Sequence, residues 1–103
     1  MDLKGGKTKV QNVFVENENE ENSMLVKFNT LLDVKNYINI AEKVASDILA
    51  YSGHYVVDGK SLMGILSLSL SSPVKIVLVD KTYKKELSTK LKEIGVLVGD
   101  KEW

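Results

Sequence analysis

Apolar residues recur at the spacing of an amphipathic helix in two stretches of the chain. In the first stretch they lie three and four residues apart, at Val34, Tyr37, Ile38, Ala41, Val44 and Ala45. Thr30 or Asp33 can accept the free N–H groups at the start of this helix. In the second stretch, which follows Asp80 and ends near Gly95, the same spacing links Tyr83, Leu87, Leu91 and Ile94. The pattern predicts two helices, each with one buried face.

Runs rich in alternating or β-branched residues predict the strands. Residues 24–28 (MLVKF) alternate in polarity, and residues 74–79 (VKIVLV) are rich in β-branched side chains. Residues 47–57 (DILAYSGHYVV) predict two short strands that turn around Ser52 and Gly53, since glycine allows the positive φ of a tight hairpin. These segments together supply four strands.

A third, shorter helix is predicted between the hairpin and the last strand. Asp58 and Gly59 turn the chain, and Ser61 can cap a helix that runs from Leu62 to about Leu68, before the sequence Ser-Ser-Pro interrupts the pattern. The element order is then β-α-β-β-α-β-α. Separated strands with helices between them predict one sheet with the helices packed on one face.

Composition divides the chain near Ser23. At 103 residues there is room for one domain. We assign residues 24–103 to that domain and residues 1–23 to a flexible acidic extension, because the run ENENEEN at residues 16–22 carries repelling charges and turn-forming asparagines. An added edge strand in the extension is the alternative, through the three valines at Val10, Val13 and Val15.

Charge and residue usage exclude several classes of function. The 14 basic and 14 acidic side chains cancel, so no global field attracts nucleic acid or an anionic membrane. Cysteine is absent, which excludes disulfides and thiolate metal sites, and no cofactor motif is present. No segment approaches the roughly 20 apolar residues of a membrane span, and the start lacks a secretory signal. We expect a cytoplasmic protein.

The segment GKSLMGILSLSL, residues 59–70, resembles the second-helix region of HPr, the small phosphocarrier protein of the bacterial sugar phosphotransferase system. The Lys-Ser-aliphatic-Met-Gly sequence, Lys60 to Gly64, carries the resemblance, which extends from about Met24 to Ile94. It implies an α+β fold, the HPr-like open-faced β-sandwich, in which three helices cover one face of a four-stranded antiparallel sheet.

The HPr family carries a phosphoryl-accepting histidine at the start of its first helix, in a His-x-Arg-Pro context. Counting back from Ser61 without gaps places Thr30 at the histidine, Leu32 at the arginine and Asp33 at the proline. A phosphate ester on Thr30 would be a poor donor, and an acyl phosphate on Asp33 would lack the neighbouring arginine. The alternative role of both residues is helix capping.

The single histidine, His54, follows the predicted hairpin turn. Turn positions favour polar side chains, and no second ligand or base lies near it in the sequence, so we interpret it as a surface residue and predict no metal site. Trp103, at the end of the chain, is either an anchor or an exposed terminus.

The family's second site is a serine that a dedicated kinase phosphorylates, which makes HPr a partner of a transcription factor. Ser61 matches that serine. The resemblance implies a partner-binding surface beside it, formed by Lys60, Leu62, Met63, Gly64 and Leu66. The competing interpretation is that serine is a common helix cap and that Leu62, Ile65, Leu66 and Leu68 are ordinary core residues.

Three functions follow as hypotheses. The first is a non-enzymatic regulatory protein, like the catabolite-repression HPr that keeps the serine and lacks the histidine, whose partners are an HPr kinase or a transcriptional regulator. The second is a phosphocarrier with a non-standard acceptor. The third is a structural or small-ligand module that shares only the fold. A concave pocket with converging polar groups favours the third hypothesis, and a flat apolar patch around Met63 disfavours it.

Overall fold

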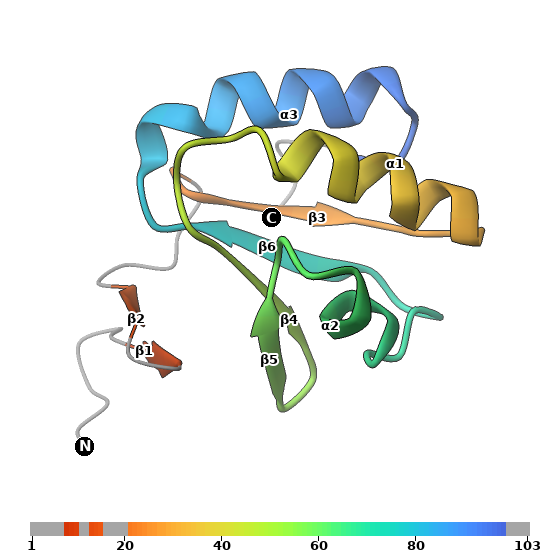
Figure 1. Cartoon of the computed structure of the whole chain (residues 1–103), viewed down its shortest axis with the longest axis horizontal. Coiled ribbons are helices and arrows are strands. Elements are labelled where there is room, and N and C mark those ends of the chain that lie inside the picture. Colours follow the sequence, from red (N-terminus) through yellow and green to blue (C-terminus); the bar gives the residue numbers. More distant parts are fainter. Residues whose placement is uncertain (1–7, 11–12, 16–20, 99–103) are drawn as a thin grey trace.

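The computed structural model describes residues 8–10, 13–15 and 21–98 of the chain. Its main sheet has four antiparallel strands in the spatial order β3-β6-β4-β5 (Figure 1). Their bounds are β3 Ser23–Val26, β4 Ile48–Ser52, β5 Tyr55–Asp58 and β6 Val74–Leu78. The predicted α+β class is therefore confirmed.

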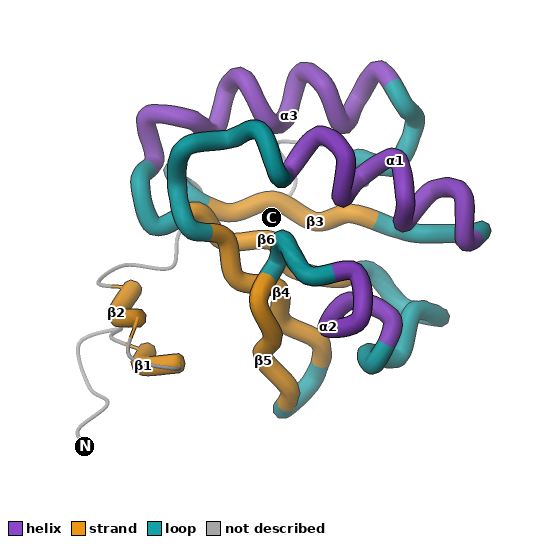
Figure 2. The backbone as a smooth tube through the Cα atoms, in the orientation of Figure 1, coloured by secondary structure: helices purple, strands orange, loops and turns teal. Residues whose placement is uncertain are grey.

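Helices separate the strands in the predicted order. The chain from β3 onward runs β-α-β-β-α-β-α, with a single 3-10 turn, η2 (Lys81–Tyr83), before the last helix. Figure 2 shows the short turn through which the chain leaves β5 and enters the second helix. The helices are α1 Leu31–Ala41, α2 Leu62–Leu66 and α3 Lys84–Glu93.

One face of the sheet carries the main core. Because side chains alternate along a strand, Met24, Ile48 and Ile76 point to the same face, and all three are buried. Every helix contributes to this cluster, through Val34, Tyr37, Ile38 and Ala41 of α1, Ile65 of α2, and Leu87 and Leu91 of α3. The three helices therefore cover the same face, as predicted.

The opposite face of the sheet has a smaller apolar cluster. Leu49 and Val77 are buried there, and Tyr51 and Val56 pack against them. The Lys75 ammonium lies 5.5 Å from the centre of the Tyr51 ring, a cation–π geometry.

Two helix ends differ from the prediction. Helix α1 ends at Ala41, so Val44 is buried but lies outside the helix, and Ala45 is exposed rather than part of the apolar stripe. The bonds that follow α1 join residues three apart, as in Val44 N–H to Ala41 C=O at 3.1 Å, and this tighter winding ends the helix. The same change ends α2 at Leu66, before the expected Leu68.

The end of the described chain forms a contact that the sequence pattern did not predict. Gly95, at φ +81°, ends the last helix as expected. The chain then returns beside β3, where Lys27 N–H donates to Val96 C=O at 2.8 Å and Val98 N–H donates to Leu25 C=O at 2.9 Å. This pairing protects the β3 edge of the sheet.

The beginning of the chain contains a second, separate sheet. Strands β1 (Thr8–Val10) and β2 (Val13–Val15) pair with each other and form no part of the main sheet. The valines therefore lie in strands, but in a hairpin rather than at the edge of the main sheet. Of the predicted acidic extension, residues 1–7, 11–12 and 16–20 lie outside the described residues, as does Trp103. The main sheet begins at Ser23, one residue before the predicted start.

A buried hydrogen bond joins the first helix to the turn that follows β5. The Tyr37 hydroxyl, fully buried, donates to the Gly59 carbonyl at 2.7 Å. Gly59 N–H in turn donates to Ile48 C=O at 2.7 Å. A Cβ added at Gly59 would lie 2.5 Å from Ile48 Cγ2, so only glycine fits against the strand. These contacts fix the chain two residues before Ser61.

We predict that Tyr37→Phe lowers the free energy of unfolding by about 1–3 kcal/mol, because the buried Gly59 carbonyl loses its donor. Urea denaturation measures the change. Tyr55→Phe is the matched control, since Tyr55 is exposed at the hairpin and its loss should change little. Equal stability of the Tyr37→Phe variant and the wild type would contradict the assigned role of this bond.

Alkaline pH gives a second test of the same bond. Burial, and then the negative charge of Asp58, raise the pKa of the Tyr37 hydroxyl far above its ordinary value of 10.0. Since the pKa of Tyr37 is higher in the folded state than in the unfolded state, the contribution of its protonated hydroxyl to the free energy of unfolding is fully present below pH 10. This contribution is lost as pH rises, with a slope that approaches about 1.4 kcal/mol per pH unit. Tyr37→Phe has no hydroxyl to ionise at residue 37, so its free energy of unfolding should not show this loss. The stability gap between wild type and variant should therefore narrow above pH 10, whereas a constant gap would contradict the prediction.

Candidate functional site

Ser61 occupies the N-cap of α2, as the sequence predicts. Its backbone is extended, at φ −101° and ψ 119°, and its Oγ accepts the Gly64 N–H at 3.0 Å. Its carbonyl accepts the Ile65 N–H at 3.0 Å, which begins the helix. The side chain is half-buried. Ser61 is thus a helix cap at a half-buried position.

The neighbours of Ser61 differ in how far they reach the surface. The Lys60 ammonium donates to the Val44 carbonyl at 2.6 Å, so its charge lies against the loop that follows α1. Leu62 is half-buried and packs on the core. Gly64 lies against the turn, because an added Cβ would be 3.3 Å from the Asp58 carbonyl oxygen. Of the proposed contact residues, Met63 and Leu66 are the ones that are exposed.

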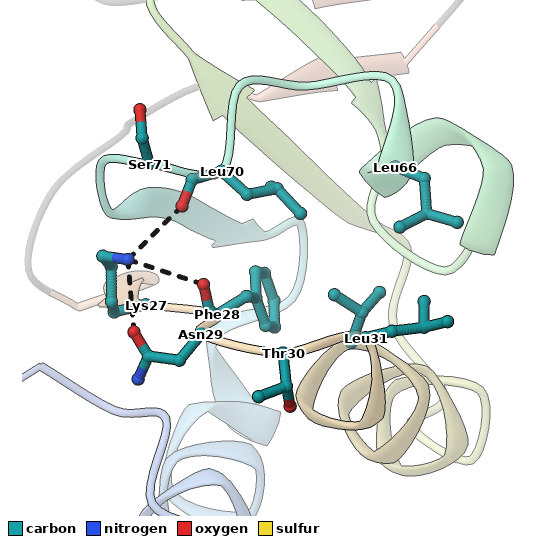
Figure 3. Close-up of a pocket in the computed structure, with 9 residues that line it drawn as sticks. Lys27, Phe28, Asn29, Thr30, Leu31, Leu66, Leu70 and Ser71 are labelled. Atoms are coloured by element: carbon teal, nitrogen blue, oxygen red, sulfur yellow. Dashed lines mark hydrogen bonds between the residues drawn. The ribbon is translucent and has the colours of Figure 1, made fainter.

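Four large apolar side chains are exposed, two at the start of α1 and two along α2. Leu31 is 53% exposed and Leu32 64%, while Met63 is 75% exposed and Leu66 40%. Met63 and Leu66 are three residues apart and so share one face of α2. Leu31 faces Leu66 across a pocket (Figure 3). We call these four residues the apolar surface.

The pocket between the two helices has a volume of about 420 Å³. Its apolar lining includes the buried Phe28 and Val34, and its polar lining includes Lys27 and Ser71. The Lys27 ammonium points toward three oxygens on the β3 and α2–β6 sides of the pocket (Figure 3). The pocket therefore combines an apolar floor with one cationic group.

Thr30 and Asp33, which the resemblance aligns with the histidine and the proline of the family motif, form a capping box. Thr30 Oγ1 accepts the Asp33 N–H at 3.0 Å. One carboxylate oxygen of Asp33 accepts two N–H groups, from Asn29 at 2.9 Å and from Thr30 at 3.2 Å. This confirms the capping interpretation. Leu32, in the place of the arginine, is exposed and belongs to the apolar surface.

His54 lies in the exposed turn between β4 and β5, next to Gly53 at φ +61°. With Tyr55 and the serines at 67 and 69, it lines a second pocket of about 590 Å³. Within the described ranges, no group of three or more His, Cys, Asp or Glu side chains is arranged to hold a metal ion.

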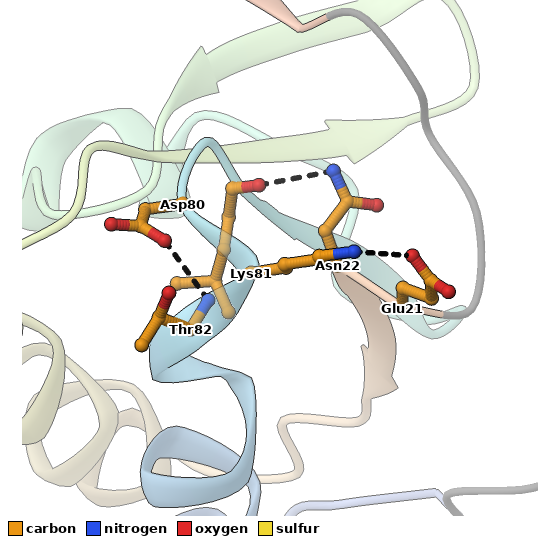
Figure 4. A network of polar contacts seen from close by, with 6 residues as sticks. Glu21, Asn22, Asp80, Lys81 and Thr82 are labelled. Carbon is orange, nitrogen blue, oxygen red and sulfur yellow. Dashed lines mark hydrogen bonds and ion pairs between the residues drawn. The ribbon is translucent and has the colours of Figure 1, made fainter.

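A second polar cluster lies at the start of α3 (Figure 4). Asp80 Oδ1 accepts the Thr82 N–H at 2.9 Å, and hydrogen bonds from the Thr82 side chain and backbone hold the pKa of the Asp80 carboxyl below its ordinary value. Lys81 pairs with Glu21 at 2.9 Å, and the Asn22 side-chain amide donates to the Leu78 carbonyl at 3.1 Å. These contacts cap the η2 turn and join the residues just before β3 to the end of β6 and to η2. Their role is structural.

Sequence reasoning missed Leu31 and the pocket residues Lys27, Phe28 and Leu70. Leu32 falls off the buried face that begins at Val34, which agrees with its exposure. Leu31 lies three residues before Val34 and seven before Ile38, at the spacing of the buried stripe, so its exposure had no signal in the sequence. The direction of the Lys27 side chain had no sequence signal, since it depends on how the loop after α2 folds over β3.

No family model matches the chain, and the comparisons with curated proteins and with solved structures also return no match. Among the helices of the described residues, none is long and apolar enough to cross a membrane. The geometry of the chain itself is therefore the basis for any functional proposal.

We predict that Thr30→Ala lowers the free energy of unfolding by about 1 kcal/mol, because the first turn of α1 loses its side-chain acceptor. Thr30→Ser keeps the acceptor and should retain most of that stability. Thr89→Ala, at an exposed position within α3, is the matched control and should change stability little. Thermal unfolding measures all three variants, and an unchanged midpoint for Thr30→Ala would contradict the capping role.

Proposed function

We propose that this chain is a non-enzymatic regulatory protein of the HPr type, which acts on partner proteins through the surface around Ser61. Phosphorylation of Ser61 would switch that surface. The partners are a serine kinase of the HPr kinase type and a transcriptional regulator. The protein works in the bacterial cytoplasm and, without the carrier histidine, passes no phosphoryl group onward.

One observation supports this proposal most directly: the helix that Ser61 caps exposes Met63 and Leu66. Leu31 lies opposite Leu66 and Leu32 adjoins it in sequence, so apolar side chains from two helices are exposed together. Single exposed apolar residues are common, but an adjoining group of them is typical of a contact site. Methionine suits such a surface because its flexible side chain adapts to different partners.

The confirmed fold class supports the proposal as well. The resemblance implies four antiparallel strands with three helices on one face, and the chain has four such strands and three such helices. The Lys60–Gly64 motif falls at the start of the second helix, where the resemblance requires it. Fold alone assigns no function, so the argument depends on the motif and the exposed surface together.

Phosphorylation at Ser61 would act mainly on the surface. A phosphate adds a charge of about −1.5 to −2 and three acceptor oxygens, beside the free N–H groups of the first turn of α2. Because α2 has only five residues, its dipole is small, and we expect little change in stability. The new charge would instead lie at the edge of the exposed Met63 and Leu66.

The pocket favours a second candidate function, a small-ligand module on the same fold. It is concave, and Lys27, Asn29 and Ser71 bring polar groups to its rim. The neighbouring apolar surface, which a small ligand would leave uncovered, favours the regulatory function over this alternative. The carrier alternative has weaker support, because Thr30 and Asp33 use their polar atoms to cap α1.

We predict that an HPr kinase and ATP add one phosphate to this chain, at Ser61, as measured by intact and fragment mass spectrometry. Ser61→Ala should abolish the modification. Ser67→Ala is the matched control, because Ser67 lies at the other end of the same helix, exposed, and its loss should leave the modification unchanged.

No modification, or modification at another serine, would contradict the proposed switch. A parallel incubation with phosphoenolpyruvate and the enzyme that loads HPr tests the carrier alternative. Acid-labile phosphate on the chain in that incubation would favour a carrier over a regulator.

A further inference from the structure

No ion pair joins the cationic group in the pocket, the Lys27 ammonium, to a carboxylate among residues 21–98. The Lys27 ammonium donates to the Asn29 side-chain oxygen at 3.3 Å, to the Leu70 carbonyl at 3.4 Å and to the Phe28 carbonyl at 3.5 Å. All three acceptors are neutral, and the ion pair found in this part of the chain joins Lys81 to Glu21 instead. These are long bonds, beyond the usual range of about 2.7–3.2 Å.

The acidic residue at the start of α1, Asp33, forms no ion pair with Lys27. One carboxylate oxygen of Asp33 accepts two backbone N–H groups at the helix start. Asp33 thus serves the helix start, and the hydrogen-bond acceptors of the Lys27 ammonium are neutral oxygens. A carboxylate that reached Lys27 would form a shorter, charge-assisted bond, stronger than any of the three it now makes.

The rest of the pocket is built for an apolar group. Phe28 and Val34 form a buried floor, and Leu31, Leu66 and Leu70 complete the apolar lining. Figure 3 shows Lys27 and Ser71 on one side of this lining and Leu31 and Leu66 on the other. An occupant would therefore place an apolar group between the leucines and a negative group beside Lys27.

We infer that the pocket binds an apolar side chain of a protein partner that carries a carboxylate on the adjacent residue, with the carboxylate paired to Lys27. A protein fits better than a free small molecule, because Leu32, next to the pocket residue Leu31, and Met63, one helical turn before the pocket residue Leu66, are exposed as well and do not line the pocket. This inference rests on the proposed function, since it specifies the chemistry by which a regulatory partner is recognised.

Short capped peptides test this chemistry directly. The full chain, labelled with ¹⁵N, is titrated with acetyl-Leu-Asp-amide, with its uncharged isostere acetyl-Leu-Asn-amide, and with acetyl-Ala-Asp-amide. We expect Leu-Asp to shift the amide signals of residues 27–31 and 66–71. It should bind about three- to fivefold more tightly than Leu-Asn, the gain expected of a partly exposed ion pair, and more tightly than Ala-Asp.

Variants identify the cation that gives this preference. Lys27→Met should bind Leu-Asp and Leu-Asn equally. Lys27→Arg keeps the positive charge and should keep the preference, which would show that the Met variant loses it through the lost charge and not through a change of fold. Lys43→Met, which removes an exposed lysine beyond the end of α1, is the matched control and should behave as the wild type.

Several outcomes would overturn the inference: equal binding of Leu-Asp and Leu-Asn by the wild type, equal binding of Leu-Asp and Ala-Asp, shifts outside the pocket, or no shift at the highest soluble peptide concentration. Tighter binding of free N-acetyl-leucine than of the peptide would also overturn it, in favour of a small-molecule site. If the peptides do not bind as expected but Ser61 is phosphorylated, the proposed function stands and the pocket inference falls. If the peptides bind as expected but Ser61 is not phosphorylated, the proposed switch is refuted and the pocket chemistry stands.

Discussion

The hydrogen bond from the Tyr37 hydroxyl to the Gly59 carbonyl joins the first helix to the turn that ends just before Ser61. Neither group has access to water, so the bond is costly to break. Gly59 is also held by its own N–H on Ile48 and by the lack of room for a side chain. The position of α2 relative to α1 depends on this fixed turn, and with it the pocket and the apolar surface between the two helices.

Helix α2 has to be stable although it is short, and it also has to leave one apolar face exposed. It has five residues and buries one of them, Ile65, so packing alone stabilises it weakly. Its caps compensate: Ser61 accepts the Gly64 N–H, and the Ser67 N–H returns to the Met63 and Gly64 carbonyls. The remaining face is thereby left free to expose Met63 and Leu66. The proposed phosphate on Ser61 would change the surface charge beside this face without a change of fold.

Sequence periodicity was sufficient for the elements whose signals are local. The buried stripe of α1, the hairpin at Gly53 and the Ser61 cap each depend on a few neighbouring residues, and each was predicted. The return of Val96–Val98 along β3 was not, because a three-residue apolar segment has no period and its partner lies some 70 residues away in the chain. The pocket was missed for the same reason: Lys27 and Leu70 meet only once the loop after α2 has folded over β3.

Native-state amide hydrogen exchange at Gly59 and Ile65 tests most directly whether α2 forms a fixed platform. The Gly59 amide is bonded to Ile48 in the sheet, and the Ile65 amide to Ser61 at the start of α2. If the Tyr37 bond holds the two together, both amides should exchange with opening free energies close to those of the β4 and β6 amides. Exchange of Ile65 at the rate of an unstructured peptide, while the sheet stays protected, would show that α2 opens on its own and that the surface around Ser61 is not preformed.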